Sequence, residues 1–91
     1  MRYEQSPGFV MQRMEGELVI FHPMKEHIIY CNETAGLIWS LCDGLRAVDE
    51  IEDILVEAYP RAVARIRTEV ETALAMLVDE GFLVTASQTK S

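Results

Sequence analysis

Cysteine and histidine are the residue types in this chain best suited to metal or thiol chemistry, and there are two of each. Cys31 and Cys42 lie eleven positions apart, whereas thiolate metal sites typically bring two sulfurs together from a short-spaced pair such as C-x-x-C. His22 and His27 flank a predicted turn and would supply two ligands at most. The spacing therefore predicts no metal site.

A thiol nucleophile needs a neighbouring base and an electropositive setting. Cys42 instead falls on the apolar face of a predicted helix in an acidic protein, which favours a small core residue. The sequence contains no glycine-rich phosphate loop and no serine nucleophile elbow. We therefore expect neither enzymatic activity nor a cofactor.

The length and composition predict one small folded domain over residues 1–86, followed by a flexible polar tail at 87–91. Apolar residues make up 49% of the chain and charged residues 25%, as in ordinary globular proteins. No apolar segment is long enough to span a membrane, and residues 1–7 do not resemble a signal peptide. The expectation is a cytoplasmic protein without membrane attachment.

The charge balance bears on the class of partner. Acidic residues outnumber basic ones 15 to 8, which gives a net charge of -7 and argues against nucleic-acid binding. Part of the excess forms a run without a basic residue: Asp49, Glu50, Glu52, Asp53 and Glu57. We interpret this run as the solvated face of a helix.

The first third of the chain predicts an antiparallel meander of three strands, at Phe9–Arg13, Leu18–His22 and His27–Cys31. The pair Glu15-Gly16 suits the tight turn between the first two strands, because glycine tolerates a positive φ. Pro23 marks the second turn, since proline cannot donate to a strand ladder.

Three helices are predicted to follow. Asn32 is a favourable N-cap for the first, and Gly44 suits its C-terminal cap. The second carries an apolar face from Val48 to Tyr59 and stops at Pro60, and the third runs from Val63 to a stop at Gly81, after which residues 82–84 pack back as an extended end. Strands followed by helices predict an α+β fold with the helices on one side of the sheet.

The predicted sheet has more apolar surface than three short helices can cover. Leu18 and Ile20 alternate with Val19 and Phe21, and the third strand likewise carries large apolar groups on both faces. Such a sheet either packs on another chain or receives an extended apolar ligand at its open surface and edge. Binding is therefore the function that the pattern favours.

One flank of the third helix mixes apolar and charged side chains. Arg67, Glu71, Leu74 and Val78 lie within about 60° of one another at 100° per residue. The flank is either an ordinary wet boundary or the wall of a groove, and the spacing leaves both open.

Residues 17–84 resemble a known family. The resemblance depends on these segments, in chain order: E-L-V-I-F-H-P, I-I-Y-C-N-E-T-A-G-L-I-W-S-L-C-D-G, V-D-E-I with Y-P, and D-E-G-F-L. Together they are similar to the PqqD-like family, whose members follow a strand ending in Asn with a Thr-Ala helix bearing Ile-Trp and an Asp-Gly stop. Two positions depart from the pattern: Cys31 replaces an aliphatic residue, and Ala47 replaces a helix-capping Thr.

The resemblance implies a winged helix-turn-helix-like fold with an N-terminal three-stranded sheet, acting as a non-catalytic recognition element. Its partners would be the leader of a ribosomally made precursor peptide and a modifying enzyme, such as a radical S-adenosylmethionine (radical SAM) protein in pyrroloquinoline quinone biosynthesis. The leader would pair with strand three and lie in a groove walled by helix three. The implied peptide-binding residues are His27, Ile28, Ile29, Tyr30, Cys31, Arg65, Arg67, Val70, Glu71, Leu74 and Val78.

We further hypothesise that Arg65 or Arg67 meets an acidic side chain of the leader, because basic residues are rare beside this groove. We expect a monomer or weak dimer. The sequence leaves two alternatives open: a winged-helix nucleic-acid-binding module and a self-associating interaction module.

Overall fold

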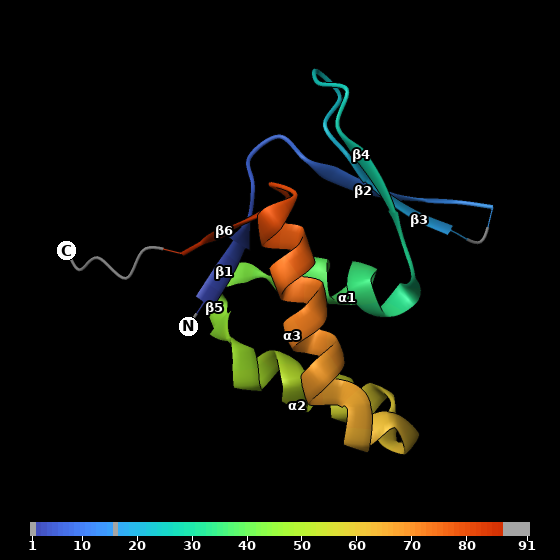
Figure 1. Cartoon of the computed structure of the whole chain (residues 1–91), viewed down its shortest axis with the longest axis vertical. Helices are drawn as coiled ribbons and strands as arrows, with labels where there is room; N and C mark the ends of the chain where they lie inside the picture. The colour runs from blue at the N-terminus through green and yellow to red at the C-terminus, as the bar shows by residue number, and fades with distance from the viewer. Residues whose placement is uncertain (1, 16, 87–91) are drawn as a thin grey trace.

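The computed structural model describes residues 2–15 and 17–86 and is shown in Figure 1. These residues form an α+β fold, as the sequence predicts, but with two antiparallel sheets in place of the one expected. In chain order the elements are β1 (Arg2–Gln5), β2 (Val10–Met14), β3 (Glu17–Phe21), β4 (Ile28–Cys31), α1 (Glu33–Leu41), β5 (Asp43–Ala47), α2 (Val48–Ala58), a short 3-10 helix η1 (Pro60–Ala62), α3 (Val63–Asp79) and β6 (Leu83–Thr85). The predicted tail at 87–91 lies outside the described residues.

The predicted meander is present as β2, β3 and β4, within one residue of the expected bounds. Glu15 takes the positive φ of the first turn, at 51°. The second sheet has the order β5-β1-β6, and its strands β1 and β5 were not predicted. The extended end expected after α3 is β6, which pairs with β1.

The predicted end of the first helix at Gly44 is wrong. The helix ends at Leu41, and the N–H of Cys42 donates to the Trp39 carbonyl at 3.1 Å. The Asp43 carboxylate then accepts from the N–H groups of Leu45 and Arg46 and turns the chain into β5. Gly44 does have a positive φ, of 83°, but this residue lies within β5 and not at the end of the helix.

The helix starts follow from their capping residues. Asn32 accepts the N–H of Ala35 at 2.8 Å and so caps α1, as predicted. Ala47 offers α2 no side-chain acceptor, but its own N–H donates to the Glu50 carboxylate at 2.7 Å. Half of a capping box therefore remains at this position.

Helix α1 covers the inner face of the meander. Gly36 lets it approach closely, because a methyl group at this position would lie 2.3 Å from Cδ1 of Leu18 and 3.4 Å from Sδ of Met11. The opposite face of the same sheet is open, with Val10, Ile28 and Tyr30 exposed. The surplus apolar surface inferred from the sequence is therefore present on one face.

The core lies between the three helices and the inner faces of the two sheets. Trp39 is 4% exposed, and its indole N–H donates to the Phe82 carbonyl at 3.0 Å. The same carbonyl accepts the N–H of Ser6, so it ties β1 and α1 to the segment after α3. Trp39 is thus a core residue in this fold.

Candidate functional site

The outer edge of β4 is the first part of the candidate site. The sheet order β2-β3-β4 leaves this edge without a partner strand among residues 2–15 and 17–86. The His22 N–H donates to the His27 carbonyl, and the register continues as Phe21 with Ile28 and Val19 with Tyr30. Because an antiparallel ladder alternates, the N–H and C=O groups of Ile28 and Tyr30 point away from β3, toward the free edge.

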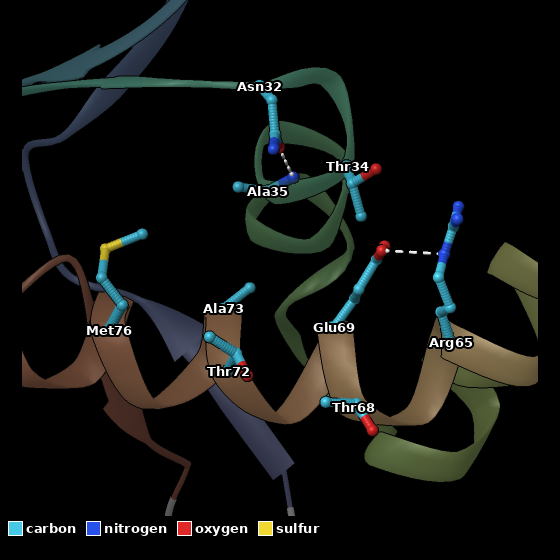
Figure 2. A pocket seen from close by; sticks show the side chains of 9 residues that line it. All are labelled: Asn32, Thr34, Ala35, Arg65, Thr68, Glu69, Thr72, Ala73 and Met76. Carbon is cyan, nitrogen blue, oxygen red and sulfur yellow. Dashed lines mark hydrogen bonds and ion pairs between the residues drawn. The ribbon is translucent and has the colours of Figure 1, made fainter. Parts of the chain in front are cut away.

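A groove between α1 and α3 is the second part of the site. It has a volume of about 480 Å³ and begins at Asn32, the residue after β4. Figure 2 shows residues from the start of α1 facing a row of side chains on α3. The groove is lined by Asn32, Thr34, Ala35, Arg65, Thr68, Glu69, Thr72, Ala73 and Met76.

The groove has a charged end and an apolar end. Arg65 and Glu69 form an i,i+4 ion pair at 3.4 Å, with side chains 70% and 40% exposed. About one and two turns beyond Glu69 along α3, Ala73 and Met76 face Ala35 across the groove (Figure 2). The groove is thus suited to an extended chain with a polar group at one end and apolar groups at the other.

The first residue of the predicted strand, His27, has a positioning role. Its ring lies 4.6 Å from that of Phe82 and 5.5 Å from that of Phe9, measured between centroids. The ring of His22 also packs against Phe9, edge to face, at a centroid distance of 5.2 Å. These four rings fix the start of β4 beside the C-terminal end of α3, so the free edge and the helix border the same space.

The predicted residues of β4 and those of α3 are placed differently. Ile28 and Tyr30 are exposed at the edge, and Ile29 and Cys31 are half buried on the inner face. On α3, Arg65 lines the groove. The other predicted α3 positions, Arg67, Val70, Glu71, Leu74 and Val78, are not among the groove-lining residues.

Packing of α3 explains this difference. Val70 and Leu74 are 0% and 5% exposed, because they belong to the core stripe of the helix. Arg67 lies on the side of α2, 3.7 Å from the Glu52 carboxylate. The groove is lined instead by positions 65, 68, 69, 72, 73 and 76, which recur every three or four residues along the flank that faces α1.

That flank carries a signal in the sequence, although a weak one. Apart from Met76, its side chains are small or polar, with threonine at 68 and 72 and alanine at 73. Small residues at helical spacing beside a core stripe are compatible with a groove. They are equally compatible with a solvated face, so spacing alone does not select them.

The two thiols do not form a site with other ligands. Burial raises the pKa of Cys42 to about 12, with a smaller part of this rise coming from the negative charge of Asp43. Burial also raises the pKa of Cys31, whose Sγ contacts the Leu18 carbonyl at 3.7 Å. Within the described part of the chain, no cluster of three or more His, Cys, Asp or Glu side chains is placed to hold a metal ion.

One exposed ion pair joins the meander to the start of α1. Arg13 on β2 binds Glu33 in the first turn of the helix, and this hydrogen bond lowers the pKa of the Glu33 carboxyl.

No helix in residues 2–15 and 17–86 combines the length and the apolar character needed to cross a membrane.

Comparison with known families and proteins gives a consistent result. The family model described as coenzyme PQQ synthesis protein D (PqqD) matches residues 17–83. Two curated proteins named PqqA binding protein, from Rhodopseudomonas palustris strains BisB5 and TIE-1, are 38% and 39% identical to this chain over 64 residues. Each match covers 70% of this chain and 63% of the length of the relative.

The fold is also similar to that of a solved structure, titled TbiB1 in complex with the TbiA(beta) leader peptide. The TM-score is 0.70 at 20% sequence identity, and the match covers 88% of this chain and 93% of the other. At this level of identity the likeness concerns the fold.

Proposed function

The chain belongs to the PqqD family, and from this premise we propose that it binds the leader segment of a ribosomally made precursor peptide as a strand added to β4. One observation carries the proposal: the free edge of β4 runs directly into a groove of about 480 Å³. Strand addition gives affinity through main-chain hydrogen bonds, and adjacent pockets give specificity through alternate side chains. The free edge of β4 can supply the main-chain hydrogen bonds, and the groove can supply the pocket.

The comparisons support the same function. The curated relatives carry the name PqqA binding protein, and the similar solved structure holds a leader peptide. The domain itself performs no catalysis in this proposal. It holds the leader and presents the precursor to a modifying enzyme, for which a radical SAM protein is the family's example.

The winged helix-turn-helix-like arrangement is part of the proposal. The meander acts as the wing, and α3 forms the wall opposite its β4 edge. The peptide lies between them, contacting β4 from His27 to Cys31 through the backbone. On α3 we keep Arg65 and add the residues of the flank that faces α1, in preference to the buried Val70 and Leu74.

A proline substitution at the β4 edge tests strand addition. Ile28→Pro removes an N–H that points away from β3, so the ladder of the meander persists while one bond to the peptide is lost. Ile28→Ala keeps that N–H and is the matched control. The probe is a short peptide obtained by display selection from a random library on the wild-type protein, with PqqA as a second probe.

We expect Ile28→Pro to bind the selected peptide about tenfold more weakly than Ile28→Ala, because one bond is lost and its acceptor is left unpaired. Fluorescence anisotropy measures the affinities, and circular dichroism checks that both variants are folded. Equal affinities of two folded variants would contradict strand addition at this edge.

A charge reversal tests the role of Arg65. Arg65→Glu is expected to weaken binding of a peptide with an acidic residue in the groove, whereas Arg67→Glu lies on the α2 side and serves as the control. Titration of the labelled peptide gives both affinities. Unchanged affinity in Arg65→Glu removes this arginine from the proposed recognition.

A further inference from the structure

The open face of the meander carries a second cavity, on the side of the sheet away from α1. It has a volume of about 440 Å³ and is lined by Met14, Glu15, Glu17, Val19 and Tyr30. We call these five residues the open-face cradle. They come from β2, the first turn, β3 and β4, so the cavity crosses the whole sheet at its hairpin end.

The strand register explains why these side chains meet. Val19 is opposite Tyr30, and Met14 is opposite Glu17. Directly opposite residues point to the same face of a sheet, as do residues two apart on one strand. Val19, at 2% exposure, forms the floor, and Met14 and Tyr30, at 51% and 64%, form exposed apolar walls.

The charges of the open-face cradle have one sign. The side chains of Glu15 and Glu17 make no ion pair or side-chain hydrogen bond with any residue of the described ranges 2–15 and 17–86. An apolar floor with two unpaired carboxylates at its rim complements a long side chain with an aliphatic stem and a cationic head. The Tyr30 ring adds a face on which such a cation packs favourably.

We propose that the open-face cradle receives a lysine or arginine side chain of the peptide bound on β4, an inference that rests on the proposed function. A strand added to β4 lies about 4.8 Å from it, so the residue next to Tyr30 projects its side chain over the ring toward Glu17. The next residue along the peptide points to the other face, into the groove. The basic residue is therefore separated by an odd number of positions from every side chain that enters the groove.

Display selection tests whether bound peptides carry a basic residue at the position next to Tyr30. Random peptides are selected in parallel on the wild-type protein, on Glu17→Lys, and on the control Glu57→Lys, which makes the same charge change at an exposed site on α2. We expect the wild type and the control to enrich a basic residue at one fixed position. Glu17→Lys is expected to lose that preference and to enrich an acidic residue there.

The energetic part of the test uses one selected peptide and its Lys→Ala or Arg→Ala version. In the wild type, we expect the substitution to weaken binding by about threefold to thirtyfold, from an exposed ion pair and a cation–π contact. In Glu17→Gln combined with Tyr30→Leu, the same peptide substitution should have almost no effect.

Two results would contradict the inference in different ways. The wild type could enrich strand-forming peptides without a preferred basic residue, or Glu17→Lys could enrich the same basic residue as the wild type. Either result contradicts binding of a basic side chain in the open-face cradle, but not strand addition at β4. Failure of every protein to enrich any peptide contradicts the proposed function itself, and the inference falls with it.

Discussion

The Cys42 side chain lies at 0% exposure in the core, directly after α1. Burial raises its pKa to about 12 from an ordinary value of 9.0, with a further contribution from Asp43. Well below pH 9.0 the thiol is protonated in both the folded and the unfolded chain. Above it, the unfolded chain ionises first, so the folded state loses stability as pH rises toward about 12.

The first prediction concerns this pH dependence. The free energy of unfolding of the wild type should fall more steeply between about pH 9 and 12 than that of Cys42→Ala, which has no thiol to ionise. Urea titrations at several pH values measure the slopes, and Cys31→Ala provides the control for a half-buried thiol. Parallel slopes for the wild type and Cys42→Ala would contradict the burial argument.

The second prediction concerns the bond between Trp39 and Phe82. Trp39→Phe removes the indole donor and leaves a small void, and should lower the free energy of unfolding by about 1–3 kcal/mol. The Phe82 carbonyl retains the Ser6 N–H, so no acceptor is orphaned and a larger loss is not expected. Tyr59→Phe, at an exposed aromatic residue, should stay within about 0.5 kcal/mol of the wild type. Urea denaturation followed by circular dichroism distinguishes the two, and equal stabilities would contradict a structural role for this bond.

At the scale of elements, the close approach of α1 to β3 depends on Gly36. Alanine is intrinsically better than glycine within a helix by about 1 kcal/mol. At this position, however, the added methyl group would lie 2.3 Å from Cδ1 of Leu18, which is itself buried. Overpacking of this kind typically costs about 1–3 kcal/mol, so the steric effect should exceed the gain in helix propensity.

The third prediction follows from this contact. Gly36→Ala should destabilise the wild type, whereas in a Leu18→Ala background the same change should be neutral or stabilising, because Cδ1 is absent. Denaturant unfolding of the four proteins closes a double-mutant cycle. A Gly36→Ala effect of the same size in both backgrounds would mean that the helix does not approach the strand at this point.

The sequence predicts some elements well and misses others for a physical reason. The meander and the three helices carry local signals: alternating apolar residues, an Asn cap and an amphipathic repeat. Strand β1 is a polar segment whose partners, β5 and β6, begin about forty and eighty residues later, so nothing in its neighbourhood reveals the pairing. Strand β5 begins with Asp43-Gly44, which has the composition of a helix stop.

The candidate site likewise depends on contacts between segments far apart in the sequence, which local patterns do not reveal. Helical periodicity places Leu74 on a flank of α3, but the structure buries this residue in the core stripe, and periodicity does not say which flank faces α1. That choice depends on how two helices far apart in the sequence pack together. The β4 edge was predicted from the resemblance to the PqqD-like family, and the sheet order leaves this edge without a partner strand among residues 2–15 and 17–86.

At the scale of the whole molecule, both outer edges of the meander lack a partner strand within the described residues. All five residues of β2 are exposed, and β4 exposes Ile28 and Tyr30. Unpaired edges are templates for pairing with another chain, whether a peptide or a second copy of the protein. Self-association and peptide binding should therefore compete if they use the same β4 edge.

The fourth prediction tests this competition. Light scattering over a range of protein concentrations should show a monomer or a weak dimer, and addition of a saturating selected peptide should shift any dimer toward the peptide-bound monomer. A dimer that binds peptide without dissociating would show that the β4 edge is not its interface. A dimer that persists and excludes the peptide would favour a self-associating module over a peptide-binding one.

The pairing of β1 with β6 has a consequence for how this fold can be connected to other proteins. The N–H of Ala86 donates to the carbonyl of Arg2 at 2.9 Å, so the two ends of the described chain meet on one side of the molecule, away from β4 (Figure 1). Chains whose ends meet tolerate circular permutation and insertion into a host protein. An enzyme fused through either end, or split around this fold, would therefore leave the peptide edge unobstructed.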